Sequence, residues 1–152
     1  IYNAGKSSDT SAGVKNRLQA DVMAHLPDVC AVMVGLNDWE QGVPVATYKA
    51  NIKYIFDTLT ASGIKPVAIT SNLQRGPTEA FASFQPYLQA FEDAAQGLPV
   101  VDLYREVAAS YLYYTTTQFY ALYVDIVHLS KVGHQFVADL AGRERYAGVF
   151  VK

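Results

Sequence analysis

Three short apolar segments, each followed by a helical pattern, constrain the fold of this chain more than any other feature. They lie at residues 29–34, 66–70 and 99–103. The first is apolar at every position, which is typical of a parallel strand that helices cover on both faces. Strands that alternate with helices predict an α/β protein, because each crossover helix must pack on the sheet. We therefore expect a three-layer α/β/α sandwich with a mainly parallel sheet.

Four amphipathic stretches supply the helices of this alternation. Their apolar residues recur at helical spacing within residues 10–26, 45–62, 78–96 and 130–143. Pro86 falls inside the third stretch, where it lacks a backbone N–H, so we expect a kink or a restart of that helix. Ile1 and Tyr2 are predicted to be the last two residues of an earlier strand.

Composition narrows the class of protein. The 152 residues, of which 51% are hydrophobic and 17% charged, fit one folded domain over 1–152. A formal net charge of −2 excludes a dedicated nucleic-acid-binding domain, which needs a basic face. No apolar run is long enough for a membrane span. No His, Cys, Asp and Glu grouping has metal-ligand spacing, so we predict no metal.

Two polar segments occur where parallel sheets carry their chemistry, at the carboxyl ends of strands. Residues 3–10 read Asn-Ala-Gly-Lys-Ser-Ser-Asp-Thr, and Gly5 there lets a backbone N–H approach a ligand. Residues 35–38 read Gly-Leu-Asn-Asp and follow the most apolar strand. The Asn37 amide and the Gly5 N–H are both suited to donate hydrogen bonds to a developing oxyanion.

A third segment opens the last predicted helix and contains Asp125 and His128. A spacing of three residues lets the carboxylate meet the imidazole and fix its tautomer. The other ring nitrogen is then free to act as a general base. His134, inside the same helix, is predicted to be structural.

Together the three segments resemble blocks two, three and five of the GDSL, or SGNH, hydrolases, in that family's order and over essentially the whole chain. The resemblance implies a flavodoxin-like α/β/α fold and a serine esterase or lipase that uses no cofactor. It implies that Gly5 and Asn37 form the oxyanion hole. It also implies that His128 is the catalytic base and Asp125 its orienting carboxylate.

One block of the family pattern is absent. The Gly-Asp-Ser stretch that carries the nucleophilic serine does not occur in the sequence, and Ser7, Ser8 and Ser130 belong to the other blocks. We expect the first strand and the serine to lie on a complementing N-terminal segment outside residues 1–152. The sheet would then have an unpaired position.

Aromatic residues point to the substrate. The tyrosine-rich stretch 111–123 precedes Asp125, and Trp39 follows Asn37 closely. We expect Trp39, Tyr120 and Tyr123 at the rim of the pocket, where such rings suit a sugar. The predicted substrate is a small-molecule or carbohydrate ester, with an O-acetyl group as first choice. Closure of the domain and an oligomer contact account for these rings equally well.

Two other functions fit part of the sequence. A carbohydrate-binding module on the same fold, without the serine, would keep the aromatic rim. The run Gly5-Lys6-Ser7 matches the tail of a phosphate-binding loop and so of a nucleotide-binding domain. That motif requires a further upstream glycine and a helix that begins at the lysine, and Ser8 and Asp9 oppose an immediate helix.

Overall fold

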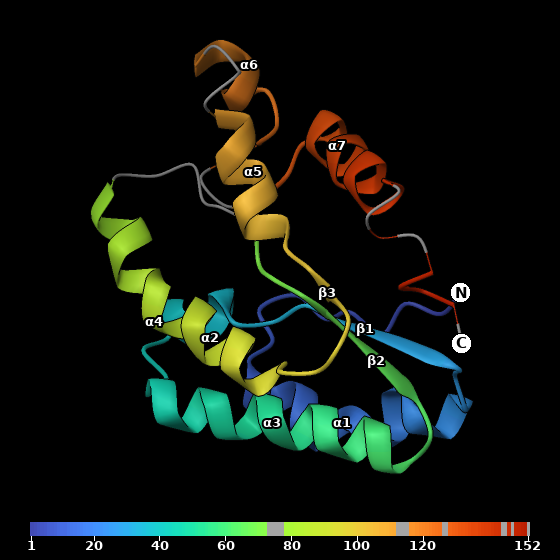
Figure 1. The fold of residues 1–152 in the computed structure, drawn as a ribbon. Coiled ribbons are helices and arrows are strands. Elements are labelled where there is room, and N and C mark those ends of the chain that lie inside the picture. Colours follow the sequence, from blue (N-terminus) through green and yellow to red (C-terminus); the bar gives the residue numbers. More distant parts are fainter. Residues whose placement is uncertain (73–77, 112–115, 126–127, 144–145, 147, 152) are drawn as a thin grey trace.

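The computed structural model describes residues 1–72, 78–111, 116–125, 128–143, 146 and 148–151. Strands and helices alternate as the sequence predicts (Figure 1). In chain order they are α1 (Ser11–Asp21), the 3₁₀ helix η1 (Met23–His25), β1 (Val29–Val32), α2 (Leu36–Glu40), α3 (Val45–Ala61), β2 (Lys65–Ile69), α4 (Thr78–Ala94), β3 (Val100–Val101), α5 (Leu103–Tyr111), α6 (Thr116–Tyr120) and α7 (Lys131–Ala141).

The three strands form one parallel sheet in the order β1-β2-β3, which confirms the predicted parallel arrangement. Val32 lies opposite Ala68, and both belong to the main core with the helices. Successive side chains of a strand point to opposite faces. Val67 and Val101 accordingly belong to a second cluster, which Tyr146 covers.

Helices lie on both sides of this sheet. Figure 1 shows α1 and α3 below the strands and α5, α6 and α7 above them. The core centres on α3, where Ile52, Ile55 and Leu59 are fully buried. The three layers confirm the predicted α/β/α class. Within the described residues, every helix falls short of the length and apolarity that a membrane crossing requires.

Two predicted elements end earlier than expected. α1 stops at Asp21 with Val22 as its C-cap, and η1 carries the chain on to Leu26, whose backbone is left-handed with φ of 49°. Leu26 precedes Pro27, and a residue before proline avoids the right-handed helical conformation, so no helix continues past it. β3 ends at Val101 because the Asp102 side chain accepts a hydrogen bond from the Arg105 N–H (3.0 Å) and so caps α5.

Two other expectations differ from the structure. α4 runs through Pro86 as one helix, so the helix does not restart there, and a kink at Pro86 stays a prediction. Phe84, Leu88 and Phe91 are buried along α4, and this packing outweighs the missing backbone hydrogen bond. Ile1 and Tyr2 belong to no strand.

β1 forms the edge of the sheet. Among the described residues it pairs with β2 alone, and Ala31 in its middle is exposed. An apolar parallel strand is ordinarily covered on both sides, so this edge is suited to accept a further strand.

Gly35, between β1 and α2, lets the Tyr48 side chain approach the backbone closely, and a substitution there tests this contact. Its φ is 133°, and a Cβ built there would lie 2.5 Å from the Tyr48 hydroxyl oxygen. That hydroxyl donates to the Val34 carbonyl at 2.9 Å. We expect Gly35→Ala to lower the free energy of unfolding by more than about 2 kcal/mol, because backbone strain and overpacking add.

The matched control is Gly42→Ala. Gly42 has a φ of 67° but open space around its Cβ position, so only the backbone penalty applies. That penalty is about 1 kcal/mol. Urea denaturation of both variants measures the difference, and equal losses would contradict the role of the Tyr48 contact.

Candidate active site

Asp125 and His128 form a hydrogen-bonded dyad. Asp125 Oδ2 lies 2.7 Å from His128 Nδ1, and Asp125 Oδ1 accepts the His128 backbone N–H at 2.7 Å. Because a carboxylate oxygen faces Nδ1, the neutral ring carries its proton there and presents Nε2 as an acceptor. The side chains of His128 and Asp125 are 73% and 50% exposed, so Nε2 is accessible to a substrate.

The dyad lies on a turn that is closed at the N-terminus of α7. Ser130 caps this helix by accepting the Gly133 N–H, and its hydroxyl donates to Ala121 O at 2.6 Å. The Ser130 N–H donates to Leu122 O at 2.8 Å, and Val124 N donates to His128 O at 2.9 Å. Ser130, at the start of α7, thus joins the end of the turn to its beginning, and the bond from Val124 to His128 closes the turn inside. Residues 126–127 lie outside the described residues.

Asn37 lies in the first turn of α2, one residue after its start. Its Nδ2 donates to the Asp9 carbonyl at 2.9 Å. An amide nitrogen carries two hydrogens and this bond uses one, so the second keeps a fixed direction. Such a held donor is what an oxyanion hole requires.

Gly5 lies in the exposed loop that leads to α1. Its N–H donates to Asn3 Oδ1 at 2.9 Å. This loop is tied to α1 by Arg17, which donates to Ala4 O and to Asp9 Oδ2, both at 2.6 Å. An oxyanion at Gly5 would take the place that the Asn3 amide oxygen holds. The role of Gly5 as a donor stays a prediction.

Asp38, the residue after Asn37, is fully buried in α2. Ser11, the first residue of α1, donates its N–H to both carboxylate oxygens (3.1 and 2.9 Å) and its hydroxyl to Oδ1 (2.5 Å). Asn51 of α3 donates to Ser11 Oγ at 3.1 Å. Burial raises the pKa of Asp38, whereas the hydrogen bonds from Ser11 act to lower it.

The three predicted rim aromatics have different surroundings. Trp39 donates its indole N–H to Ser83 Oγ at 3.0 Å and meets the Phe84 ring edge-on, so it joins α2 to α4. Tyr120 is 47% exposed. Tyr123 is 5% exposed, and burial raises its pKa to about 12. Contact of these rings with a substrate stays a prediction, and the tyrosines within 112–115 lie outside the described residues.

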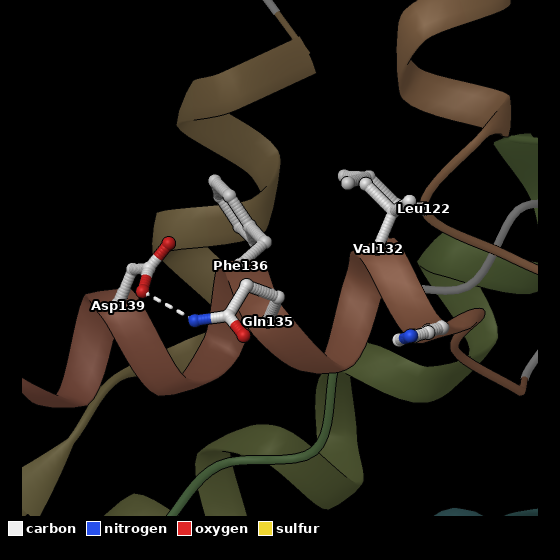
Figure 2. A pocket seen from close by; sticks show the side chains of 6 residues that line it. Leu122, Val132, Gln135, Phe136 and Asp139 are labelled. Carbon is white, nitrogen blue, oxygen red and sulfur yellow. Dashed lines mark hydrogen bonds between the residues drawn. The ribbon is translucent and has the colours of Figure 1, made fainter.

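A cavity of about 360 Å³ adjoins the dyad turn. Figure 2 shows its apolar side chains, Leu122, Val132 and Phe136, beside Gln135, which donates to Asp139 at 2.8 Å. Lys131 completes the lining. Leu122 and Lys131 lie on either side of the turn that carries the dyad in the sequence. Among the described residues, no three His, Cys, Asp or Glu side chains gather as metal ligands would.

Sequence reasoning missed the buried polar group of Ser11, Asp38 and Asn51. One signal was present, because Asn51 interrupts the apolar face of the helix that contains Tyr48, Ile52 and Ile55. A polar residue at such a position needs a buried partner. The identity of that partner depends on the tertiary fold, which brings together residues 40 positions apart.

Comparison with known proteins identifies the family of the chain. The model of the GDSL-like lipase/acylhydrolase family matches residues 1–136. No curated protein sequence matches the chain.

Solved structures share the fold at low sequence identity. The acetyl xylan esterase AlAXEase superposes with a TM-score of 0.82 at 21% identity, over 91% of this chain and 77% of that one. The lipase/acylhydrolase from Enterococcus faecalis gives 0.73 at 22%, over 91% and 71%. A catalytic mutant of Axe2, an acetylxylan esterase from Geobacillus stearothermophilus, gives 0.76 at 20%, over 91% and 68%.

Gly133 offers a test of how the dyad turn is held. A Cβ there would lie 2.0 Å from Leu122 O, the same oxygen that accepts the Ser130 N–H. Gly133→Ala should therefore displace Leu122 O, break that bond and cost about 1–3 kcal/mol of stability. Thermal denaturation and hydrogen exchange at the Ser130 amide measure both effects.

Gly142→Ala is the control, because a Cβ there would lie at ordinary contact distance, 3.5 Å from Ala138 O and 3.6 Å from Asp139 O, and the φ of Gly142 is −78°. Stability should be unchanged or slightly higher. Slow exchange of the Ser130 amide in Gly133→Ala would show that the close approach does not hold the turn.

Proposed function

The chain belongs to the GDSL-like lipase/acylhydrolase family, and on that premise we propose that it is a serine ester hydrolase whose base is His128. The observation that carries the proposal is the dyad, in which Asp125 holds His128 Nδ1 at 2.7 Å while the ring remains exposed. A histidine oriented in this way by a carboxylate is the base component of a catalytic triad.

The first half of the proposed reaction forms an acyl-enzyme. His128 Nε2 takes the proton of a serine hydroxyl, and the serine oxygen bonds to the ester carbonyl carbon. The electron pair of the carbonyl moves to its oxygen, where the Gly5 N–H and the second Asn37 Nδ2 hydrogen stabilise the charge. When the pair returns, the bond to the alcohol oxygen breaks and His128 gives that oxygen its proton.

The second half returns the enzyme to its starting state. Water gives a proton to His128 Nε2 and bonds to the acyl carbon. The serine oxygen then leaves and recovers the proton from His128, and the carboxylic acid is released. Asp125 stays ionised throughout and stabilises the imidazolium that forms twice in the cycle.

We infer that the nucleophilic serine lies on a segment outside residues 1–152. The sequence contains no Gly-Asp-Ser stretch, although the other matched blocks are present. Among the described residues β1 pairs with β2 alone and Ala31 is exposed, and this edge supports the idea that a further parallel strand brings the serine to the site.

The proposed substrate is an O-acetyl ester of a carbohydrate. Tyr120 offers an exposed ring near the dyad turn, and such rings stack on sugars. Two of the structural neighbours are acetyl xylan esterases. Their fold likeness makes acetylated xylo-oligosaccharide the first substrate to test.

Single substitutions test the assigned roles in the natural full-length protein. We expect His128→Ala to lower kcat by several orders of magnitude and Asn37→Ala by about 10²–10³. Asp125→Asn should fall between them, because the ring loses its correct tautomer. Acetate release from p-nitrophenyl acetate and from acetylated xylo-oligosaccharide measures kcat, and circular dichroism checks folding.

His134→Ala and Cys30→Ala are the controls. His134 is exposed on α7, and Cys30 is a half-buried strand residue whose thiol pKa is raised by burial. Neither should change kcat by more than about twofold, because side chains away from such a site act mainly on stability. Loss of hydrolysis in His134→Ala with full hydrolysis in His128→Ala would refute the choice of base.

A fluorophosphonate probe locates the nucleophile. It bonds to an activated serine oxygen and releases fluoride, so peptide mass spectrometry identifies the labelled residue. We expect a label outside residues 1–152 that is lost in His128→Ala, because the serine is activated by its base. A label on Ser7, Ser8 or Ser130 would overturn the inferred source of the serine, and the absence of any label would favour the binding-module alternative.

A further inference from the structure

Asp38 is a fully buried carboxylate that lies next to Asn37 on α2. Burying such a group costs free energy unless hydrogen bonds replace its water. Ser11 provides three of them, two from its N–H and one from its hydroxyl. The Ser11 N–H belongs to the first turn of α1, where helix N–H groups lack partners inside the helix. Asp38 therefore accepts a hydrogen bond from a backbone N–H that has no partner inside α1, 27 residues earlier in the chain.

Asn37 and Gln41 bind the same segment as Asp38. Asn37 Nδ2 donates to Asp9 O at 2.9 Å, and Gln41 Nε2 donates to Ser8 O at 3.4 Å. The bond to Asp9 gives the Asn37 amide its direction. That bond forms only if residues 8–11 stay in register with α2.

The link made by Asp38 is the buried one of the three. Gln41 is exposed, and the Asn37 bond is part-buried. Asn51 reinforces the buried link from α3, since its Nδ2 donates to Ser11 Oγ and its Oδ1 accepts from Lys15 Nζ at 3.5 Å. A hydrogen bond shielded from water resists opening more than an exposed one.

We propose that Asp38 is a positioning residue for the oxyanion hole: by clamping Ser11 to α2, it holds Asp9 O where it orients the Asn37 amide. This inference rests on the proposed function. Asp38 touches neither the substrate nor the reacting atoms, so it acts through Asn37. The same clamp fixes residues 8–10 beside α2 and so limits the movement of the Gly5 loop, which Arg17 ties to Asp9.

Asp38→Asn is the variant that tests the clamp. It keeps the side-chain volume but replaces one acceptor with an NH₂ group that faces a donor on Ser11. We expect kcat to fall by about 10- to 100-fold with KM nearly unchanged, because a small misplacement of a catalytic donor has costs of this size. Ser11→Ala keeps the backbone bonds and should have a smaller effect of the same kind.

A double-mutant cycle separates positioning from general stability. If Asp38 acts through Asn37, the variant Asn37→Ala/Asp38→Asn has the kcat of Asn37→Ala alone. Two losses that multiply would overturn the proposal. The assays run below the Tm of every variant, and Asp57→Asn, an exposed carboxylate on α3 paired with Lys53, is the control with unchanged kcat.

A second readout does not depend on activity. The Asn37 side-chain NH₂ signals in a ¹H–¹⁵N spectrum are identified by their loss in Asn37→Ala. We expect Asp38→Asn to shift them and speed their hydrogen exchange, whereas Asp57→Asn leaves them in place. Unmoved Asn37 signals in Asp38→Asn would overturn the clamp. Full turnover in both His128→Ala and Asn37→Ala would instead refute the proposed function. The Asn37 side-chain signals would then still test whether Asp38 holds Asn37 in place.

Discussion

Burial of helix α3 is the constraint on which the rest of the molecule depends. The helix packs against α1, α4 and β2 at once. Its side chains also hold the segment that leads to the site, because the Tyr48 hydroxyl donates to Val34 O between β1 and α2. Burial raises the pKa of Tyr48, so this phenol remains a neutral donor. The position of α2, and of Asn37 within it, thus follows from the packing of α3.

The two halves of the candidate site are held in different ways. The oxyanion half depends on Asp38, which is fully buried, and on partners far away in the chain. The base half lies on an exposed turn, where His128 is held by a carboxylate three residues away. A base that takes protons from a substrate complex must be accessible, whereas a donor must keep its direction while charge develops.

Periodicity predicted the sheet and the principal helices, because apolar spacing determines which faces can be buried. Spacing also predicted the pairing of Asp125 with His128, since three residues suffice to bring the two groups together. The ends of elements depended on single residues that periodicity does not weigh, such as Asp102, which caps α5 directly after β3. The partner of Asp38 could not be predicted, because it depends on how α1 meets α2 in three dimensions.

The hydrogen bonds of the base half join residues close in the sequence, whereas those of the oxyanion half join residues far apart. The two halves of the site therefore form in a definite order. The hydrogen bonds between Asp125 and His128 are local, because they join residues three apart on a turn that Ser130 caps. Orientation of Asn37 needs α1, α2 and α3 to be packed, because Asn51 and Ser11 complete the buried link. Local contacts form at low entropic cost, whereas distant ones require the core first. Any loosening of the α3 core therefore acts on the oxyanion donors before it reaches the base.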